Sequence, residues 1–469
     1  MTIRIWSLAA GVALSFAGAG LSAQSPADTV HLTIDAAVAR ALAQGADMRL
    51  AHAQVQDAQG QITEALAGAL PQITGSVVYT RQFASIYQGT ASDTSSIARL
   101  FKNSPFGAPN LWNIQIQATQ LVWAGGKTGA ALSAAKAFRE GARDTEQQTA
   151  ADITFAVRRA YLDAAYSARL LDIARENLAQ ARDHQRQVQL YHQAGTRADY
   201  DLLRAQVDAA NQEPSVVAAS NGYDVTLRQL KQLLNVPIEQ PIALDSPLGE
   251  VGDTVLVAVL DSLAPAGRPV LAAAEANVSV EEQAVRAAKA DRFPTLSVST
   301  TYSEQAFPQE VFPSGSAFRR GWNGEVRLTV PLFQGFRTTG EIGRARAALL
   351  RAQAQRDQVR QQVDAEVAQA KDELVRAQTL LVARRETVRL AQRAEHLAHT
   401  RYANGLASQV EVSDARVATQ QAEVNDVQAM HDYLVALAQL ERALGRPVPL
   451  TPRPLDQLAA ATTSKDSEP

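Results

Sequence analysis

The residues whose types and spacing could support chemistry gather in two similar stretches of this 469-residue chain. They read "YHQAGTRADYDLLRAQ" at 191–206 and "RYANGLASQVEVSDAR" at 401–416. In the second stretch Glu411 and Asp414 lie three residues apart, so a helix would carry both carboxylates on one face. Taken alone, such a pair is most often a solvated helix face.

Two further groups have the spacing of ion pairs or metal ligands. Asp201 and Arg204 are also three residues apart, and a local ion pair of about 0.2–0.5 kcal/mol is the simplest interpretation. Glu395, His396 and His399 have a spacing that would suit a metal ion. No further ligand is evident, so a solvated helix face is favoured and no metal or cofactor is expected.

Several classes of protein are disfavoured by what the sequence lacks. It has no glycine-rich phosphate loop, no nucleophile elbow and no cysteine, and its seven histidines are scattered. We therefore do not expect an enzyme. With 45 Lys and Arg against 48 Asp and Glu, the chain offers no basic field for nucleic acid.

Two long segments without proline, about Lys127 to Gln193 and Gly340 to Asn404, predict very long helices. Apolar residues recur in each at alternating steps of three and four, with occasional skipped steps such as the one at Ser167, which is the spacing of a coiled-coil seam. The first seam comprises Ile153, Val157, Ala160, Ala164, Leu171, Ala174, Leu178, Ala181 and Val188, and the second Val363, Val367, Ala370, Leu374, Ala377, Leu381, Val388 and Ala391. About 65 residues at 1.5 Å each make a rod on the order of 100 Å.

A glycine follows each long helix, and a return helix follows each glycine. Gly195 and Gly405 stand 210 residues apart, and glycine reverses a chain at φ > 0 without steric cost. The return helices are expected at about Asp199–Leu234 and Ser408–Leu444. Pro214 should break or kink the first of them.

Four segments alternate between apolar and polar residues with the period of a β-strand. They are expected at about 72–82, 111–122, 295–304 and 322–332. Each covers roughly the 9–11 residues that a tilted strand needs to cross a bilayer. A soluble sheet with one wet face is the other interpretation, but the long polar loops between the paired strands favour a membrane barrel.

The same order of elements occurs twice. "LVWAGGKTG" at 121–129 matches "PLFQGFRTT" at 331–339, again 210 residues apart, and "ALPQITGSVVY" at 69–79 echoes "RFPTLSVSTTY" at 292–302. We therefore predict an internal two-fold repeat. The expected division is a signal peptide at 1–23, a first repeat at 24–235, a linker at 236–267, a second repeat at 268–445 and a flexible tail at 446–469.

The N-terminus has the pattern of an export signal. Arg4 precedes the apolar run "LAAGVALSFAGAGL", and "LSAQS" offers Ala23 before a cleavage point. The apolar run is too short to span a bilayer. An exported chain that begins near Gln24 is expected.

Four strands cannot close a barrel, and an open sheet edge is not tolerated in hydrocarbon. Other copies of the chain must therefore complete the sheet. Two copies give eight strands, a barrel filled by its own side chains, whereas three give twelve. We expect a homotrimer whose long helices form a second, α-helical barrel that projects from the membrane.

In these features the sequence resembles the TolC-like outer membrane efflux protein family. The resemblance rests on the doubled strand–loop–strand segments, on "LVWAGG" and "PLFQGF", and above all on "RYANGLASQVEVSDAR". It implies a mainly α fold with a trimeric twelve-stranded outer-membrane β-barrel on a periplasmic helical tunnel. It also implies a passive exit duct that works with a periplasmic adaptor protein and an inner-membrane transporter.

The resemblance assigns roles to several residues. Glu411 and Asp414 would form acidic rings at the periplasmic gate, and Tyr402 would belong to the network that closes it, with Asp201 as an acidic partner. Where the family prototype has a latch arginine this chain has Ala407, and Arg401 or Arg197 are the candidates to replace it. The residues expected to dock the adaptor are Gly195, Thr196, Asp201, Gly405 and Leu406.

A soluble periplasmic coiled-coil scaffold is the alternative function. It would explain the heptads and the tips, but not four alternating strands with long loops between them. The cargo does not follow from the sequence, since a drug, a metal ion, another small molecule or a protein would suit the same duct.

Overall fold

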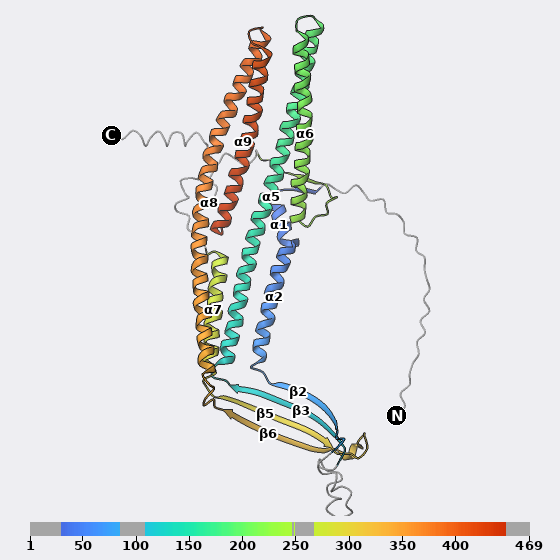
Figure 1. Cartoon of the computed structure of the whole chain (residues 1–469), viewed down its shortest axis with the longest axis vertical. Coiled ribbons are helices and arrows are strands. Elements are labelled where there is room, and N and C mark those ends of the chain that lie inside the picture. Colours follow the sequence, from blue (N-terminus) through green and yellow to red (C-terminus); the bar gives the residue numbers. More distant parts are fainter. Residues whose placement is uncertain (1–29, 85–107, 246–247, 249–266, 447–469) are drawn as a thin grey trace, which may run out of the picture.

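The computed structural model describes residues 30–84, 108–245, 248 and 267–446. Helices run side by side along the long axis of the molecule, and a four-stranded sheet lies across one end of them (Figure 1). The expected signal peptide, most of the loop after the first strand, most of the linker and nearly all of the tail lie outside the described residues.

Two helical hairpins form the half of the molecule farthest from the sheet. The first consists of α5 (Lys127–Gln193) and α6 (Asp199–Leu233), and the second of α8 (Arg337–Ala403) and α9 (Gln409–Leu444). Helix α9 lies against α5, so the order across this half is α6, α5, α9, α8. The two turns lie together at the end of the rod (Figure 1).

Near the sheet, two shorter helices take the places of α6 and α9. Helix α2 (Ala46–Ala67) lies on α5, and α7 (Pro269–Ala290) lies between α5 and α8. The order across this half is therefore α2, α5, α7, α8. Helices α2 and α8 are its outer edges, and each has one side without a neighbour in the described chain.

A small element ties the first residues to the middle of the rod. Strand β1 (Val30–Leu32) pairs in parallel with β4 (Ile242–Leu244), and α1 (Ile34–Gln44) packs against α5. The hydroxyl of Tyr161 donates a hydrogen bond to the carbonyl of Leu32 at 2.9 Å. Three-residue strands are too short for a clear alternation, so the sequence did not predict this pair.

The large sheet has the strand order β2, β3, β5, β6, and every neighbouring pair is antiparallel. The strands are β2 (Gln72–Arg81), β3 (Asn110–Trp123), β5 (Thr295–Ala306) and β6 (Arg319–Thr329), with a short 3₁₀ turn, η2 (Gly315–Ala317), before β6. Among the described residues, strands β2 and β6 are the edges of this sheet, and each has an unpaired side.

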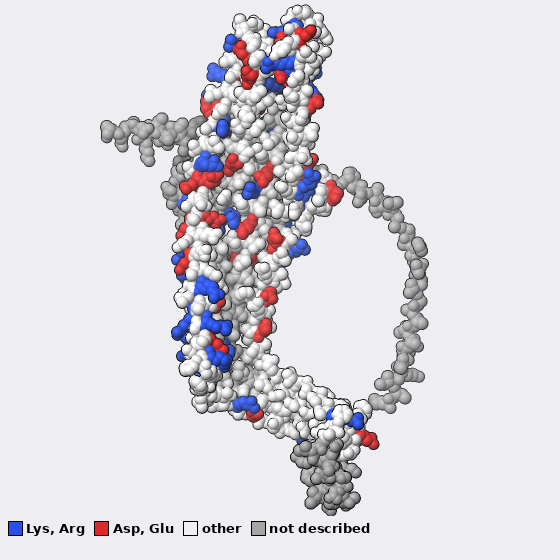
Figure 2. Space-filling model, in the orientation of Figure 1, with Lys and Arg blue, Asp and Glu red and all other residues white. Residues whose placement is uncertain are grey.

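The register aligns the alternation of all four strands. Val77 faces Ile114, Tyr79 faces Trp112, and Tyr302 faces Trp322, all on one face of the sheet. The other face pairs polar residues, such as Ser76 with Gln115. The sheet is thus apolar on one face and polar on the other, and charged residues are sparse across it (Figure 2).

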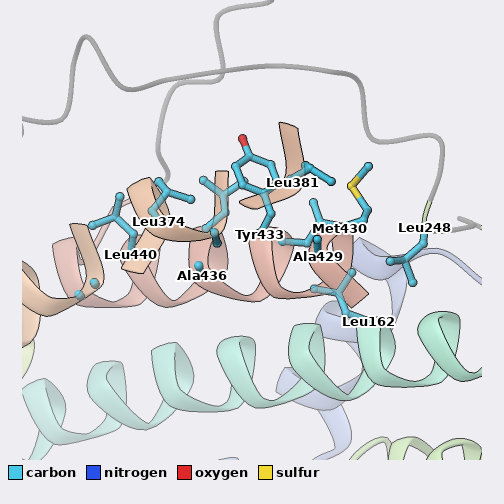
Figure 3. Close-up of a cluster of buried hydrophobic side chains, with 14 of the residues drawn as sticks. Leu162, Leu248, Leu374, Leu381, Ala429, Met430, Tyr433, Ala436 and Leu440 are labelled. Carbon is cyan, nitrogen blue, oxygen red and sulfur yellow. The ribbon is translucent and has the colours of Figure 1, made fainter. Parts of the chain in front are cut away.

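The largest apolar core lies where α5, α8 and α9 meet, midway along the rod. Leucines from the three helices and from the linker converge there on Met430 and Tyr433 (Figure 3). Leu162 comes from α5, Leu374 and Leu381 from α8, and Leu440 from α9. Each fully buried leucine contributes about 1.5–3 kcal/mol, and alanines between them allow the helices to approach closely.

The predicted seams are confirmed. Every seam residue of both long helices is buried or half-buried, including Val157, Leu171, Leu374 and Leu381. Helix α5 has the predicted ends, and α8 begins at Arg337, three residues before Gly340, because Phe336 with φ 64° starts the helix.

Two details differ from the expected structure: helix α6 does not break at Pro214, and strand β6 is shorter. Helix α6 continues through Pro214, because the carbonyl that loses its partner belongs to Ala210 on the exposed side, where water can replace the bond. Strand β6 ends at Thr329, short of the expected 332, since Pro331 has no N–H to donate to a ladder.

Over the described residues, no helix combines the length and the apolar character that crossing a membrane requires.

Candidate functional site at the helix tips

Both tips reverse the chain with the same backbone motif. Gly195 and Gly405 have φ of 74° and 70°. The N–H of Thr196 donates to the carbonyl of Tyr191 at 3.0 Å, and the N–H of Leu406 donates to that of Arg401 at 2.8 Å. These bonds, with those of the two glycines, are the Schellman arrangement that ends a helix.

The tips differ in how their return helices begin. Ser408 accepts a hydrogen bond from the N–H of Glu411 at 3.3 Å, and the Glu411 carboxylate accepts one from the N–H of Ser408 at 3.4 Å. This reciprocal pair is a capping box, worth about 1 kcal/mol. At the first tip the corresponding residue is Ala198, which makes no side-chain cap.

One contact links the two tips across the hairpins. The guanidinium of Arg197 lies 4.3 Å from the ring centre of Tyr402, the geometry of a cation–π contact. Arg197 stands 210 residues before Ala407, so the arginine absent from the second tip is present at the matching place in the first. Arg401, the other candidate latch, instead pairs with Glu411 at 3.7 Å within its own tip.

Beneath this contact the two hairpins meet through polar side chains. Gln409 is buried, and its amide lies 3.4 Å from His184 Nε2 and 3.4 Å from the carbonyl of Asp201. One layer further along, Ser413 donates to Asp208 at 3.3 Å. We refer to Tyr402, His184 and Gln409 as the polar layer.

The polar layer is incompletely satisfied. The hydroxyl of Tyr402 and the side-chain oxygen of Gln409 are buried without a hydrogen-bond partner among the described residues. Each unsatisfied group costs roughly 1–3 kcal/mol. Packing of the hairpins is therefore weaker here than at the leucine core.

Burial changes the acidities in this layer. Burial, helped by the nearby Arg416 and His399, lowers the pKa of His184, although Asp208 opposes the shift. Burial also raises the pKa of the Tyr402 hydroxyl. Both shifts favour the neutral form, so at neutral pH the layer carries no charge of its own.

The structure separates the two predicted gate carboxylates. Glu411 is engaged by Ser408 and Arg401, which gives it a structural role at the start of α9. Asp414 is exposed and makes no hydrogen bond or ion pair among the described residues. Of these two carboxylates, only Asp414 carries a charge that is not paired with another described residue.

The remaining predicted residues also have definite places. Thr196 donates its hydroxyl to the carbonyl of Tyr191 at 2.8 Å, Leu406 is 70% exposed, and Asp201 is half-buried. His396 and His399 are exposed on α8. Within the described part of the chain, no group of three potential ligands is positioned to hold a metal ion.

His184 and Gln409 were not identified from the sequence. A signal was present, because the first seam steps from Ala181 directly to Val188 and omits the intermediate position, which is filled by Gln185 next to His184. A polar residue at a seam position indicates a site where two helices meet through hydrogen bonds.

Comparison with known sequences identifies one matching family model, described as outer membrane efflux protein, over residues 37–236 and 260–446. Fusaric acid resistance protein FusA of Burkholderia cepacia is 25% identical over 340 residues, which is 67% of this chain and 58% of FusA. Protein CyaE of Bordetella pertussis is 29% identical over 261 residues, 54% of each chain. The chain thus spans little more than half the length of these relatives.

Several solved structures share the fold. VceC of Vibrio cholerae is 20% identical with a TM-score of 0.72, and the match covers 88% of this chain and 96% of VceC. CmeC of Campylobacter jejuni is 15% identical with a TM-score of 0.72, over 92% and 89% of the two chains. The open-state channel MtrE of Neisseria gonorrhoeae is 18% identical with a TM-score of 0.72, over 88% and 89%.

Proposed function

Because the chain belongs to the outer membrane efflux protein family, we propose that three copies form a passive exit channel. In this proposal, the channel accepts substrate from an inner-membrane transporter through a periplasmic adaptor protein and conducts it across the periplasm and the outer membrane. The sheet lies in the outer membrane, and the rod extends into the periplasm.

The observation that carries the proposal is the two-faced sheet. Its apolar face is exposed, with Trp322 at 82% and Val326 at 71%. A soluble protein rarely exposes such a continuous apolar face, and a soluble scaffold would gain nothing from it. A sheet in lipid needs this face outward and the polar face toward an aqueous pore.

Two bands of aromatic residues mark the edges of the apolar face. Toward the end far from the helices, Tyr79 and Trp112 stack with ring centres 5.0 Å apart, and Tyr302 and Trp322 form a cross-strand pair on the next two strands. At the junction with the helices lie Trp123, Phe293, Phe333 and Phe336. Strands of about ten residues, tilted by about 40°, separate the bands by roughly 25 Å, the height of an outer-membrane apolar belt.

The unpaired edges of the sheet support closure by further copies. Strands alternate in direction, so β6 of one copy and β2 of the next can pair antiparallel around a complete ring. Three copies give a barrel of twelve strands, wide enough for a water-filled pore.

The outer helices carry unpartnered apolar seams. On α6 the residues are 56–70% exposed, and on α8 they are 38–55% exposed. The α6 residues are Tyr200, Leu203, Val207 and Val217, and the α8 residues are Val375, Val382, Leu390 and Leu397. Coiled-coil seams of this kind require another helix, and a second copy of the chain supplies one.

An internal duplication predicts how these seams meet. Helices α5 and α8 both have 67 residues and begin 210 residues apart. Within the chain, Gln409 of α9 reaches His184 of α5. Shifting both helices by 210 residues places α6 of one copy on α8 of the next, with Leu203 opposite Leu390. The same packing would then repeat around a ring of six hairpins.

In this assembly the tips form the periplasmic gate and the docking surface for the adaptor. Tyr402 and Arg197 hold the two hairpins together, and three copies of Asp414 would ring the opening, backed by Glu411. Like charges about 8 Å apart at an effective dielectric near 20 repel by roughly 2 kcal/mol per pair, so the ring favours cations. The exposed turn around Thr196 and Leu406 offers the adaptor its contact.

Membrane fractionation and single-channel recording test the proposal. The protein should be extracted from outer membranes only by detergent, run as a heat-sensitive trimer, and conduct ions in planar bilayers. A soluble monomer without conductance would overturn it.

The gate has its own test. Asp414→Ala should remove most of the cation preference of the channel, whereas Glu411→Ala should mainly loosen the start of α9. Equal cation preference in Asp414→Ala and the unaltered channel would show that the constriction lies elsewhere.

A further inference from the structure

Three arginines form a column on α8 close to the sheet. Arg337, Arg344 and Arg351 are seven residues apart, so they lie on one face of the helix. Positive charge gathers over this end of α8 (Figure 2). Arg337 pairs with Glu341 in its own helix, but Arg344 and Arg351 are exposed and make no hydrogen bond or ion pair among the described residues.

The opposite edge of the molecule carries a matching acidic column. Asp57 and Glu64 lie seven residues apart on α2 and are exposed. Asp57 accepts a hydrogen bond only from Gln61 of the same helix, and Glu64 has no partner among the described residues. The residues beside this column have small side chains, and among them Ala53 and Gly60 are exposed. A Cβ added at Gly60 would meet open space.

The geometry for joining these edges exists inside the chain. Helices α2 and α7 both have 22 residues and begin 223 residues apart, as α5 and α8 begin 210 apart. Helix α7 lies on α5, where a Cβ at Gly141 would be 3.1 Å from the Cβ of Ala276, and Lys127 pairs with Asp291 at 2.8 Å. The two helices are thus antiparallel.

Transferring this packing to two copies sets a register. Arg351 of one copy takes the position equivalent to Gly141, and Ala53 of the next copy takes the position equivalent to Ala276. At the second contact, the positions equivalent to Lys127 and Asp291 are Arg337 of one copy and Gly68 of the next. In this register Asp57 falls between Arg344 and Arg351, about 5 Å along the axis from each, at 1.5 Å per residue.

The remaining acidic residue fits the same register. Glu64 falls between Arg337 and Arg344, again about 5 Å from each along the axis. Gly60 stands opposite Arg344, and Ala53 stands opposite Arg351. Small residues therefore face the arginines and leave room for their side chains.

We propose that the arginine column of α8 interleaves with the acidic column of α2 on the neighbouring copy and fixes the register between subunits. The inference rests on the trimer proposed above and names its membrane-proximal contact. Inside the chain the corresponding α5–α7 contact has the small residues Gly141 and Ala276 together with one ion pair, Lys127 with Asp291, at its end. Opposite charges at the places between copies favour the correct neighbour over other packings.

Engineered disulfides test the register, since the chain has no cysteine of its own. Ala53→Cys with Arg351→Cys should crosslink copies in oxidised outer membranes and give dimer and trimer bands without reductant. The matched pair Gly141→Cys with Ala276→Cys should close within one chain and keep the mobility of a monomer. Ala53→Cys with Arg337→Cys should not crosslink, because the residues would be about 21 Å apart along the axis.

Charge exchange tests the ion pairs themselves. Arg344→Glu with Arg351→Glu should at least halve the trimer fraction at the temperature where the unaltered protein is half dissociated. Asp57→Arg with Glu64→Arg should do the same, and the four changes combined should restore the trimer. Arg376→Glu, at a residue paired within α8, serves as the control and should change nothing.

The outcomes separate this inference from the proposed function. The register is wrong, and the channel proposal stands, if the unaltered protein is a trimer but the Ala53–Arg351 cysteine pair fails to crosslink. The same holds if the four combined charge changes give less trimer than either double change alone. If the unaltered protein forms no oligomer, the channel proposal fails with it.

Discussion

The two tips have the same turn but different anchors. Both use a glycine near φ 70° and the same pair of backbone hydrogen bonds. The second tip then starts its return helix with a capping box, whereas the first starts with Ala198 and no side-chain cap. In exchange, the first tip carries Arg197, which reaches across to Tyr402 of the second.

This difference distinguishes contacts within one tip from contacts between the two tips. The second tip is fixed by its own residues, Ser408 and Glu411, and keeps its shape when the hairpins part. The first tip has an internal contact between the side chains of His192 and Asp199, and in addition it contacts the other hairpin through Arg197. Separation of the hairpins should therefore loosen the first tip more than the second.

The largest effect is expected where the tips are alike. Gly195→Val and Gly405→Val force a β-branched residue to φ > 0, at a cost of about 2 kcal/mol or more each. The added Cβ meets no neighbouring atom at either glycine, so the cost comes from the backbone conformation. Hydrogen exchange at 190–200 and 400–412 should rise at the altered tip, and efflux should fall while the trimer persists.

Asparagine provides the control, because it tolerates the left-handed conformation. Gly405→Asn should retain most of the efflux that Gly405→Val loses. If valine and asparagine behave alike at both tips, the glycines are not required by their backbone conformation.

Exchanging the caps should sharpen the comparison. Ser408→Ala removes the capping box and should destabilise the start of α9 by about 1 kcal/mol. Ala198→Ser combined with Asp201→Glu builds the same box at the first tip and should protect it by a similar amount. Amide exchange of residues 199–204 and 409–414 measures both, and opposite signs are expected.

Removing the link between the tips should affect only one of them. Arg197→Ala eliminates a cation–π contact worth about 0.5–1 kcal/mol at an exposed site. Exchange should increase at residues 191–200 and stay unchanged at 403–412, and the closed channel should open more often in bilayers. Arg197→Lys keeps the charge and is the control. Equal loosening of both tips would contradict the distinction drawn here.

The smallest effect expected is a pH response of the polar layer. The pKa of His184 is lowered by burial, so the neutral form is favoured by the packed hairpins. The stability that this packing provides is present above the ordinary histidine pKa of 6.5 and is lost as pH falls through and below it. Protection of the tips should decrease between about pH 6.5 and 5, and His184→Gln should remove that dependence.

His431, midway along the rod, should make stability depend on pH in the opposite direction. Burial lowers its pKa, but hydrogen bonds to Asp163 at 2.7 Å and Asp432 at 3.1 Å outweigh that effect and raise it. The stability from these bonds is complete below pH 6.5 and is lost as pH rises through the elevated pKa. Acid should therefore loosen the tips while the middle of the rod stays packed.

The long helices were predictable because their seams repeat many times. Each apolar residue such as Leu374 or Leu381 confirms the same spacing, and glycines mark both ends of the pattern. The β1–β4 pair was not predictable, since three-residue strands such as Val30–Leu32 carry no period. The helix does not break at Pro214, because a local preference yields to a helix held along its whole length.

The site was predictable in its position but not in its contacts. The tip glycines and Tyr402 are visible in the sequence, and the seam residue missing between Ala181 and Val188 lies next to His184 of the polar layer. Which carboxylate is committed is not visible, because Glu411 and Asp414 look alike until the cap at Ser408 is seen. The reach of Arg197 depends on a side-chain conformation that only the packed hairpins select.

Equal helix lengths have a consequence for how this protein can change in size. Helices α5 and α8 each contain 67 residues, a span of roughly 100 Å, so both tips end level with each other. Deleting seven residues from one helix alone would shift that helix by about 10 Å against its neighbours. No rotation of the helix would restore the original side-chain contacts. Only matched heptads removed from all four long helices would keep the ends level. The reach of the rod can therefore change only in steps that both hairpins share.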